Sequence, residues 1–63
     1  MTKLQELLLK IKALRDAQKA DFDAYTDDLS KMPADVKARV KARDVDIEAL
    51  EKEAKEIEEL EAL

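Results

Sequence analysis

The sequence predicts an all-α protein, an antiparallel hairpin of two helices that pack like a coiled coil. Three observations predict it. The composition is typical of long helices, because 44% of the residues are charged, 3% are aromatic and Gly is absent. Apolar residues recur at spacings of three and four, the period of a helix face. The single proline, Pro33, interrupts this pattern near the middle of the 63-residue chain.

The first helix is expected over about residues 3–29. Thr2 is followed three residues later by Gln5, which is the spacing of a capping box. In a capping box the two side chains satisfy each other's free backbone N–H groups, so the helix is expected to start at Lys3.

The second helix is expected over about residues 33–62. Pro33 has no backbone N–H and disfavours helical dihedrals at Met32, so we expect a turn at about residues 30–32. The same proline is suited to the first position of a helix. No Gly, Asn or Pro follows before Leu63, a pattern that suggests a segment of a longer protein.

The apolar residues of the two halves are expected to form one seam within the chain. If Leu4 pairs with Leu60 and Leu29 with Val36, every pair of numbers adds to 64 or 65. An antiparallel hairpin that turns near residue 32 requires such a constant sum. The expected seam consists of Leu4, Leu7, Ile11, Leu14, Phe22, Tyr25, Leu29, Val36, Val40, Ile47, Leu50, Ala54, Ile57 and Leu60.

The distribution of charge predicts the same orientation. Residues 1–19 and 29–43 each carry five basic groups and few acidic ones, whereas residues 20–28 carry four Asp and residues 44–63 nine acidic groups. Antiparallel packing places each basic segment beside an acidic one, and parallel packing places the two basic segments together. Each exposed pair contributes only a few tenths of a kcal/mol, but the repulsion in the parallel arrangement extends along the whole helix.

Two polar residues, Gln18 and Arg43, interrupt the expected seam. One interpretation is that they fix the register of the helices, as a buried polar residue does in a coiled coil. For Arg43 we favour another interpretation, in which its stem covers Phe22 and its guanidinium reaches water.

A second set of apolar residues does not fit the seam: Leu8, Leu9, Val45 and Leu63. A chain this short, without disulfides or a metal, usually needs a partner or very regular packing. We therefore expect a second copy of the chain, or a larger partner protein, to cover these residues. The simplest such homo-oligomer is a pair of hairpins that dimerise into a four-helix assembly. The alternative is that they are scattered surface side chains that need no partner.

The composition also limits the function. Without Cys, His or Gly, the chain has no disulfide, zinc finger, thiol nucleophile, imidazole base or glycine-rich phosphate loop. We therefore expect no enzyme, no cofactor and no metal site. The longest apolar run, Leu7–Leu9, is too short to span a membrane, and no signal peptide is visible, so we expect a cytoplasmic location.

Charged clusters suggest two further functions. The basic cluster could bind RNA, as in the plasmid copy-control hairpin Rop, which this chain resembles in length and in its opening, Met1-Thr2-Lys3. No aromatic residues accompany the cluster and the chain is acidic overall, so we expect its bases to pair with nearby Asp residues instead. The acidic end could imitate a nucleic-acid duplex and inhibit a protein partner, or form a solvated face with pairs such as Glu48–Lys52 and Glu51–Lys55. The basic cluster is Lys37, Arg39, Lys41 and Arg43, and the acidic end includes Glu56, Glu58, Glu59 and Glu61.

The residues Met1–Leu7 and Asp46–Glu53, joined by a charged helix and a short break, resemble a known family. They are similar to the N-terminal segment, or delta domain, of tailed-bacteriophage major capsid proteins of the Hong Kong ninety-seven fold. The resemblance implies a helical scaffold that helps capsid subunits assemble and is then removed by a protease, in the cytoplasm of a bacterial host. No cleavage signature of such a protease is visible in this chain.

Overall fold

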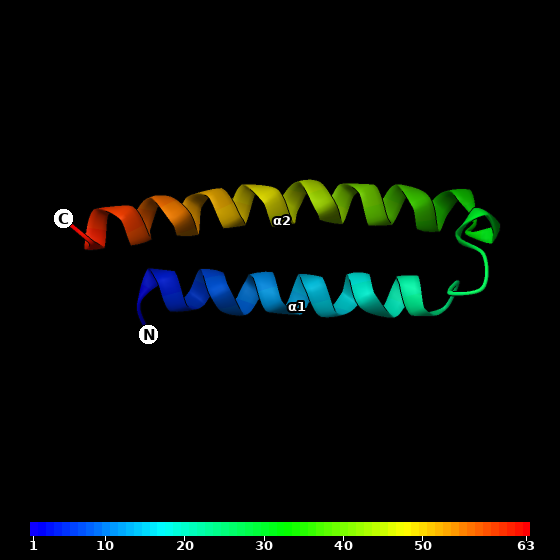
Figure 1. Ribbon diagram of the computed structural model, residues 1–63, viewed down its shortest axis with the longest axis horizontal. Helices are drawn as coiled ribbons and strands as arrows, with labels where there is room; N and C mark the ends of the chain where they lie inside the picture. The colour runs from blue at the N-terminus through cyan, green and yellow to red at the C-terminus, as the bar shows by residue number, and fades with distance from the viewer.

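The computed structural model describes all 63 residues and is a hairpin of two antiparallel α-helices (Figure 1). Helix α1 spans Lys3–Asp23 and helix α2 spans Ala34–Glu61, and between them lies a short 3-10 turn, Leu29–Lys31. The molecule measures 47 × 17 × 16 Å. Both termini lie at one end, where α2 extends beyond the start of α1 (Figure 1). The predicted all-α, two-helix hairpin is confirmed.

The start of α1 is the predicted capping box. The Gln5 backbone N–H donates to the Thr2 hydroxyl at 3.2 Å, and the Thr2 backbone N–H donates to Gln5 Oε1 at 2.9 Å. Two backbone donors that the helix itself leaves free are thus satisfied, and the helix begins at Lys3 as expected.

The predicted end of the first helix at residue 29 is wrong, because α1 ends at Asp23. The Tyr25 N–H already bonds to the Phe22 carbonyl at 3.0 Å, a turn tighter than an α-helix. Asp28 is extended, and its carboxylate accepts the backbone N–H of Ser30 at 2.9 Å. The Ser30 hydroxyl and this N–H together lower the pKa of Asp28. Local bonds of this kind compete with the helix and explain the earlier stop.

Helix α2 lies within one residue of its expected bounds at both ends. Pro33 stands at its N-cap, and its carbonyl accepts the first helical bond, from Lys37 N–H at 2.9 Å. Asp35 adds a negative charge in the first turn, where the helix dipole favours it.

The core is small and lies mainly toward the end that holds the termini. Leu7, Ile11 and Ala54 form a buried cluster. Leu4, Leu50 and Ile57 pack around it and are partly buried, as the predicted pairing requires. At the other end Val36 and Met32 are buried, and Met32 was expected only in the turn.

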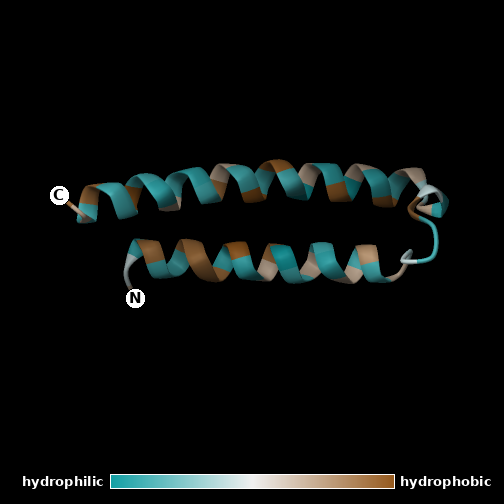
Figure 2. Ribbon diagram, in the orientation of Figure 1, coloured by the Kyte–Doolittle hydropathy of each residue, from teal (hydrophilic) through white to brown (hydrophobic).

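Three residues of the expected seam are exposed instead. Leu29 lies in the 3-10 turn outside both helices, and 52% of it is exposed. Leu60 is 68% exposed, since it lies in the last turn of α2, where α2 extends past α1. Phe22 is 40% exposed because α1 ends one residue after it. Figure 2 shows that apolar residues concentrate in the first turns of α1, whereas α2 is largely hydrophilic.

Candidate functional site

A layer of polar side chains crosses the seam between the two apolar ends. It consists of Gln18 and Asp21 from α1 and Arg39 and Arg43 from α2, and we call it the polar layer. Arg43 Nη1 donates to Gln18 Oε1 at 2.8 Å and to Asp21 Oδ2 at 2.6 Å. Arg39 donates through Nε and Nη2 to the two oxygens of Asp21 at 3.2 and 2.9 Å. The Gln18 amide donates to the Val40 carbonyl at 2.9 Å.

Arg43 and Asp21 are largely shielded from solvent, whereas Arg39 lies at the edge of the polar layer with 51% of its side chain exposed. Only 14% of the Arg43 side chain and 18% of the Asp21 side chain are exposed. No buried side-chain nitrogen or oxygen lacks a partner. Hydrogen bonds from Arg39 and Arg43 lower the pKa of Asp21 from 3.8 to about 2. The same carboxylate raises the pKa of Arg39. Asp21 is therefore ionised across the neutral range.

The favoured interpretation of Arg43, with its guanidinium in water above Phe22, is wrong. The guanidinium lies in the seam because Asp21 and Gln18 supply acceptors there. Gln18 and Asp21 are three residues apart and so share one side of α1, a spacing that could have revealed the pair from the sequence. Arg39 and Arg43 of α2 both bond to Asp21 of α1, and these bonds form only when the two helices are aligned as they are here. Such contacts are expected of polar residues that fix the register of a helix pair.

The polar layer includes two of the four residues of the basic cluster. Arg39 and Arg43 are held by Asp21, as the pairing alternative expects, while Lys37 and Lys41 are exposed and form no ion pair within the chain. Two of the four bases that could hold phosphates are thus occupied.

The predicted helical pairs of the acidic half do not form. Glu51 instead forms an ion pair with Arg15 across the two helices. The i,i+4 pairs of the structure lie in α1, where Lys12 meets Asp16 at 2.8 Å and Lys19 meets Asp23 at 3.6 Å. The acidic end stays exposed and unpaired within the chain, namely Glu56, Glu58, Glu59 and Glu61.

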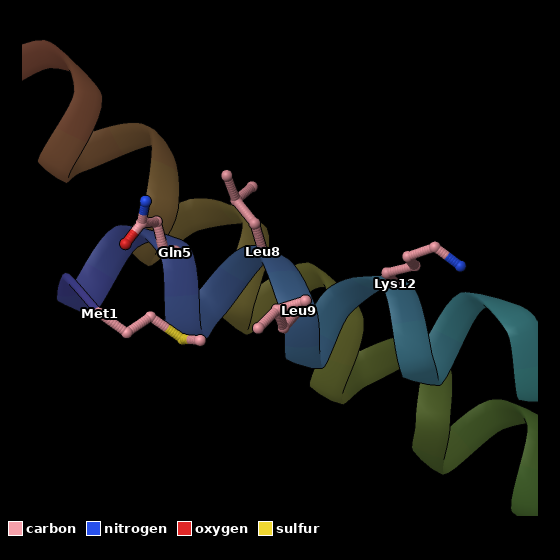
Figure 3. Close-up of a pocket in the computed structure, with 5 residues that line it drawn as sticks. All are labelled: Met1, Gln5, Leu8, Leu9 and Lys12. Atoms are coloured by element: carbon pink, nitrogen blue, oxygen red, sulfur yellow. The ribbon is translucent and has the colours of Figure 1, made fainter.

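An apolar surface is exposed on the first turns of α1. Leu8 is 46% exposed and Leu9 54% exposed, and with Met1, Gln5 and Lys12 they line a shallow depression. Figure 3 shows that Leu8 and Leu9 project from α1 in different directions. Leu8 thus contributes to more than one surface.

One of these surfaces is a flank where both helices are accessible, which we call the Leu8 flank. Leu8, Arg15, Glu51, Lys55 and Glu58 line a groove there, above the buried Ile11 and Ala54. Spacings of three, four and seven residues place further charged residues on the same sides of the two helices. The flank therefore comprises Leu8, Lys12, Arg15 and Lys19 on α1 and Asp44, Glu48, Glu51, Lys55 and Glu58 on α2.

The four residues expected at an oligomer interface are exposed, but they do not form one face. Leu9 is two residues from the buried Leu7, so it points away from α2. Val45 is likewise two residues from the buried Ile47, so it points away from α1. Leu63 lies beyond the end of α2. One partner on one face cannot cover all four.

No protein-family model, no curated protein and no solved structure matches this chain. Neither helix contains a segment long and apolar enough to cross a membrane. The structure brings together no group of three or more acidic residues that could hold a metal ion. The polar layer and the exposed flanks are therefore the features from which a function can be argued.

Proposed function

We propose that this hairpin is a non-enzymatic assembly module that associates with further copies of itself. The observation that carries the proposal is its surface area. A compact monomer of 7.2 kDa is expected to expose about 4100 Å², and this chain exposes 4845 Å², roughly 700 Å² more. Each partner of a standard protein interface buries about 800 Å². The excess is therefore close to what one partner would cover.

The small core supports the same proposal. Only six of the 63 residues are buried, and a single layer of two helices cannot bury more than one side of each. Covering the exposed half of Leu8 contributes about 1 kcal/mol in each copy. Two hairpins that pack as a four-helix assembly are the simplest closed arrangement that gains this energy.

Such a module suits the scaffold that the resemblance to capsid delta domains implies. A scaffold needs contacts that are individually weak and reversible, and many copies in one shell then supply the avidity. A surface with a few apolar side chains among exposed charges offers contacts of this strength. If the reading frame continues past Leu63 into a capsid domain, this role is supported; a continuation into an unrelated domain contradicts it.

Analytical ultracentrifugation over a range of concentrations tests self-association directly. We expect a concentration-dependent oligomer, and we expect the variant with Leu8→Glu and Leu9→Glu to be a monomer with unchanged helicity, since both residues lie outside the core. Val45→Glu places a single negative charge on the outer side of α2 and serves as the control for the surface of α1. A wild-type chain that remains a monomer at high micromolar concentration contradicts the proposal.

The exposed, unpaired carboxylates of the acidic end favour a second candidate, an adaptor or inhibitor that imitates a nucleic-acid duplex. Reversing Glu56, Glu58, Glu59 and Glu61 to Lys should then abolish capture of a nucleic-acid-binding partner and leave self-association unchanged. Capture that survives the reversal excludes this function.

A further inference from the structure

We propose that the second copy docks on the Leu8 flank about a two-fold axis parallel to the helices, so that α1 of each hairpin packs antiparallel on α2 of the other. This inference rests on the proposed self-association and adds the face and the orientation.

The two helices contribute charges of different sign to the Leu8 flank. On α1, Lys12, Arg15 and Lys19 form a basic stripe that begins at Leu8, and Lys12 and Lys19 also form ion pairs with Asp16 and Asp23 along the same helix. On α2, four of the five flank residues are acidic, and Lys55 is the exception. The two stripes run side by side, and the Arg15–Glu51 ion pair joins them at one point. The flank thus has one basic edge and one acidic edge.

The charges of the flank distinguish two possible symmetry axes for the dimer. Two hairpins can meet through the same flank about an axis parallel to the helices or about an axis across them. The crosswise axis places α1 on α1, so the basic stripes face each other. The parallel axis places α1 on α2 twice, so each basic stripe faces an acidic one. Opposite charges at both contacts select the parallel axis.

The parallel axis also fixes which residues of the two hairpins face each other. Rotation about an axis parallel to the helices does not change the position of a residue along that axis. The numbers of two residues that face each other across the dimer contact therefore add to about 64, as they do for residues paired in the seam within one hairpin. Lys19 then faces Asp44 of the partner subunit, and Arg15 faces Glu48 of the partner subunit. Asp44 and Glu48 are exposed and form no ion pair within the hairpin. The contact therefore gives partners to carboxylates that the single hairpin leaves free, and Arg15 and Lys19 share their charge between these and Glu51 and Asp23 of their own chain.

The size of the flank agrees with this arrangement. A face of the molecule is 47 Å long and about 17 Å wide, an area of the order of the ~800 Å² that each partner of a standard interface buries. Leu8 lies at this face and would rest on the aliphatic stem of Lys55 of the partner subunit.

The test reverses single charges on the two sides of α2 and measures the dissociation constant by analytical ultracentrifugation. Asp44→Lys should weaken association by a factor of roughly 2 to 30, which corresponds to the loss of two exposed ion pairs in a symmetric dimer. Asp46→Lys is the matched control, because Asp46 lies two residues away on the other side of α2, and its association should stay at the wild-type level. Glu48→Lys should repeat the effect of Asp44→Lys. Circular dichroism monitors the fold of each variant.

A mixing experiment identifies the partner of Asp44. Lys19→Glu alone should weaken association as Asp44→Lys does, and a mixture of the two variants should associate more tightly than either variant alone. If the wild-type chain associates but the Asp44 and Asp46 variants behave alike, or mixing restores nothing, the orientation is wrong and self-association stands. If the wild-type chain is a monomer, both proposals fail.

Discussion

Leu7 and Leu8 are adjacent residues of the same type in opposite environments, and replacing each by Ala tests how the hairpin is stabilised. Leu7 is 1% exposed and packs in the cluster with Ile11 and Ala54. Truncation of such a buried leucine costs 2–5 kcal/mol. We expect about 3 kcal/mol, below the middle of this range, because two helices without a covering layer can partly close the cavity. In a domain of this size that corresponds to a fall in Tm of roughly 15 °C.

Thermal unfolding followed by circular dichroism measures the effect, and Leu8→Ala is the control. The truncation of Leu8 removes contacts from a half-exposed side chain, so we expect a loss of less than about 1 kcal/mol at concentrations where the chain is a monomer. Equal losses of stability for the two variants, or a larger loss for Leu8→Ala, would refute the assignment of Leu7 to the core and Leu8 to the flank.

The polar layer and the helix cap give three further predictions. Arg43→Met should lower Tm, because Asp21 and Gln18 then lose the donor that they share. Lys41→Met, a change to Met at an exposed lysine two residues away, should lower Tm less. Equal Tm values for the two variants would contradict a stabilising role of the polar layer. The free energy of unfolding should decrease as the pH falls from 3.8 through about 2, because the pKa of Asp21 is lowered in the folded state. The ionised Asp21 contributes its full stabilisation only above its pKa in the unfolded chain. Asp21→Asn should remove this part of the loss of stability in acid. Thr2→Ala should cost about 1 kcal/mol and fray the start of α1 in amide-exchange measurements, whereas Thr26→Ala, outside both helices, should leave that exchange unchanged.

The sequence predicts much of this fold because its local and long-range signals agree. The capping box at Thr2 and the break at Pro33 are local rules that the structure obeys. The constant sum of paired positions places Leu7 beside Ile57 and Ile11 beside Ala54, and these residues do pack together. Helix period, charge and turn thus indicate one arrangement.

The end of α1 could not be predicted from apolar periodicity alone. Tyr25 and Leu29 continue the helical spacing, yet the Asp28 carboxylate bonds locally to Ser30 and the chain leaves the helix. A side chain that accepts a hydrogen bond from a nearby backbone N–H favours a turn, and this preference is stronger here than the preference for a helix that two apolar residues at helical spacing provide. The pairing of Asp28 with Ser30 two residues later was the available signal.

The polar layer is only partly predictable from the sequence. The interruption of the seam at Gln18 and Arg43 and the pairing of the basic cluster with nearby Asp residues are separate expectations there. Apolar periodicity does not indicate that they describe one site, in which Asp21 accepts from both Arg39 and Arg43 within the seam. The position of Asp21 three residues after Gln18, on the same side of α1, is the signal that joins them.

In the hairpin the chain folds back on itself, so a distance between the two helices of one chain distinguishes it from an extended helix. Spin labels at Lys10→Cys and Glu53→Cys, in a chain with no other cysteine and diluted with unlabelled chains, report that distance alone. With helix axes 8–10 Å apart, labels on exposed side chains should lie within roughly 25 Å of each other. A continuous helical rod at 1.5 Å per residue would separate these positions by about 65 Å, and that result would contradict the hairpin.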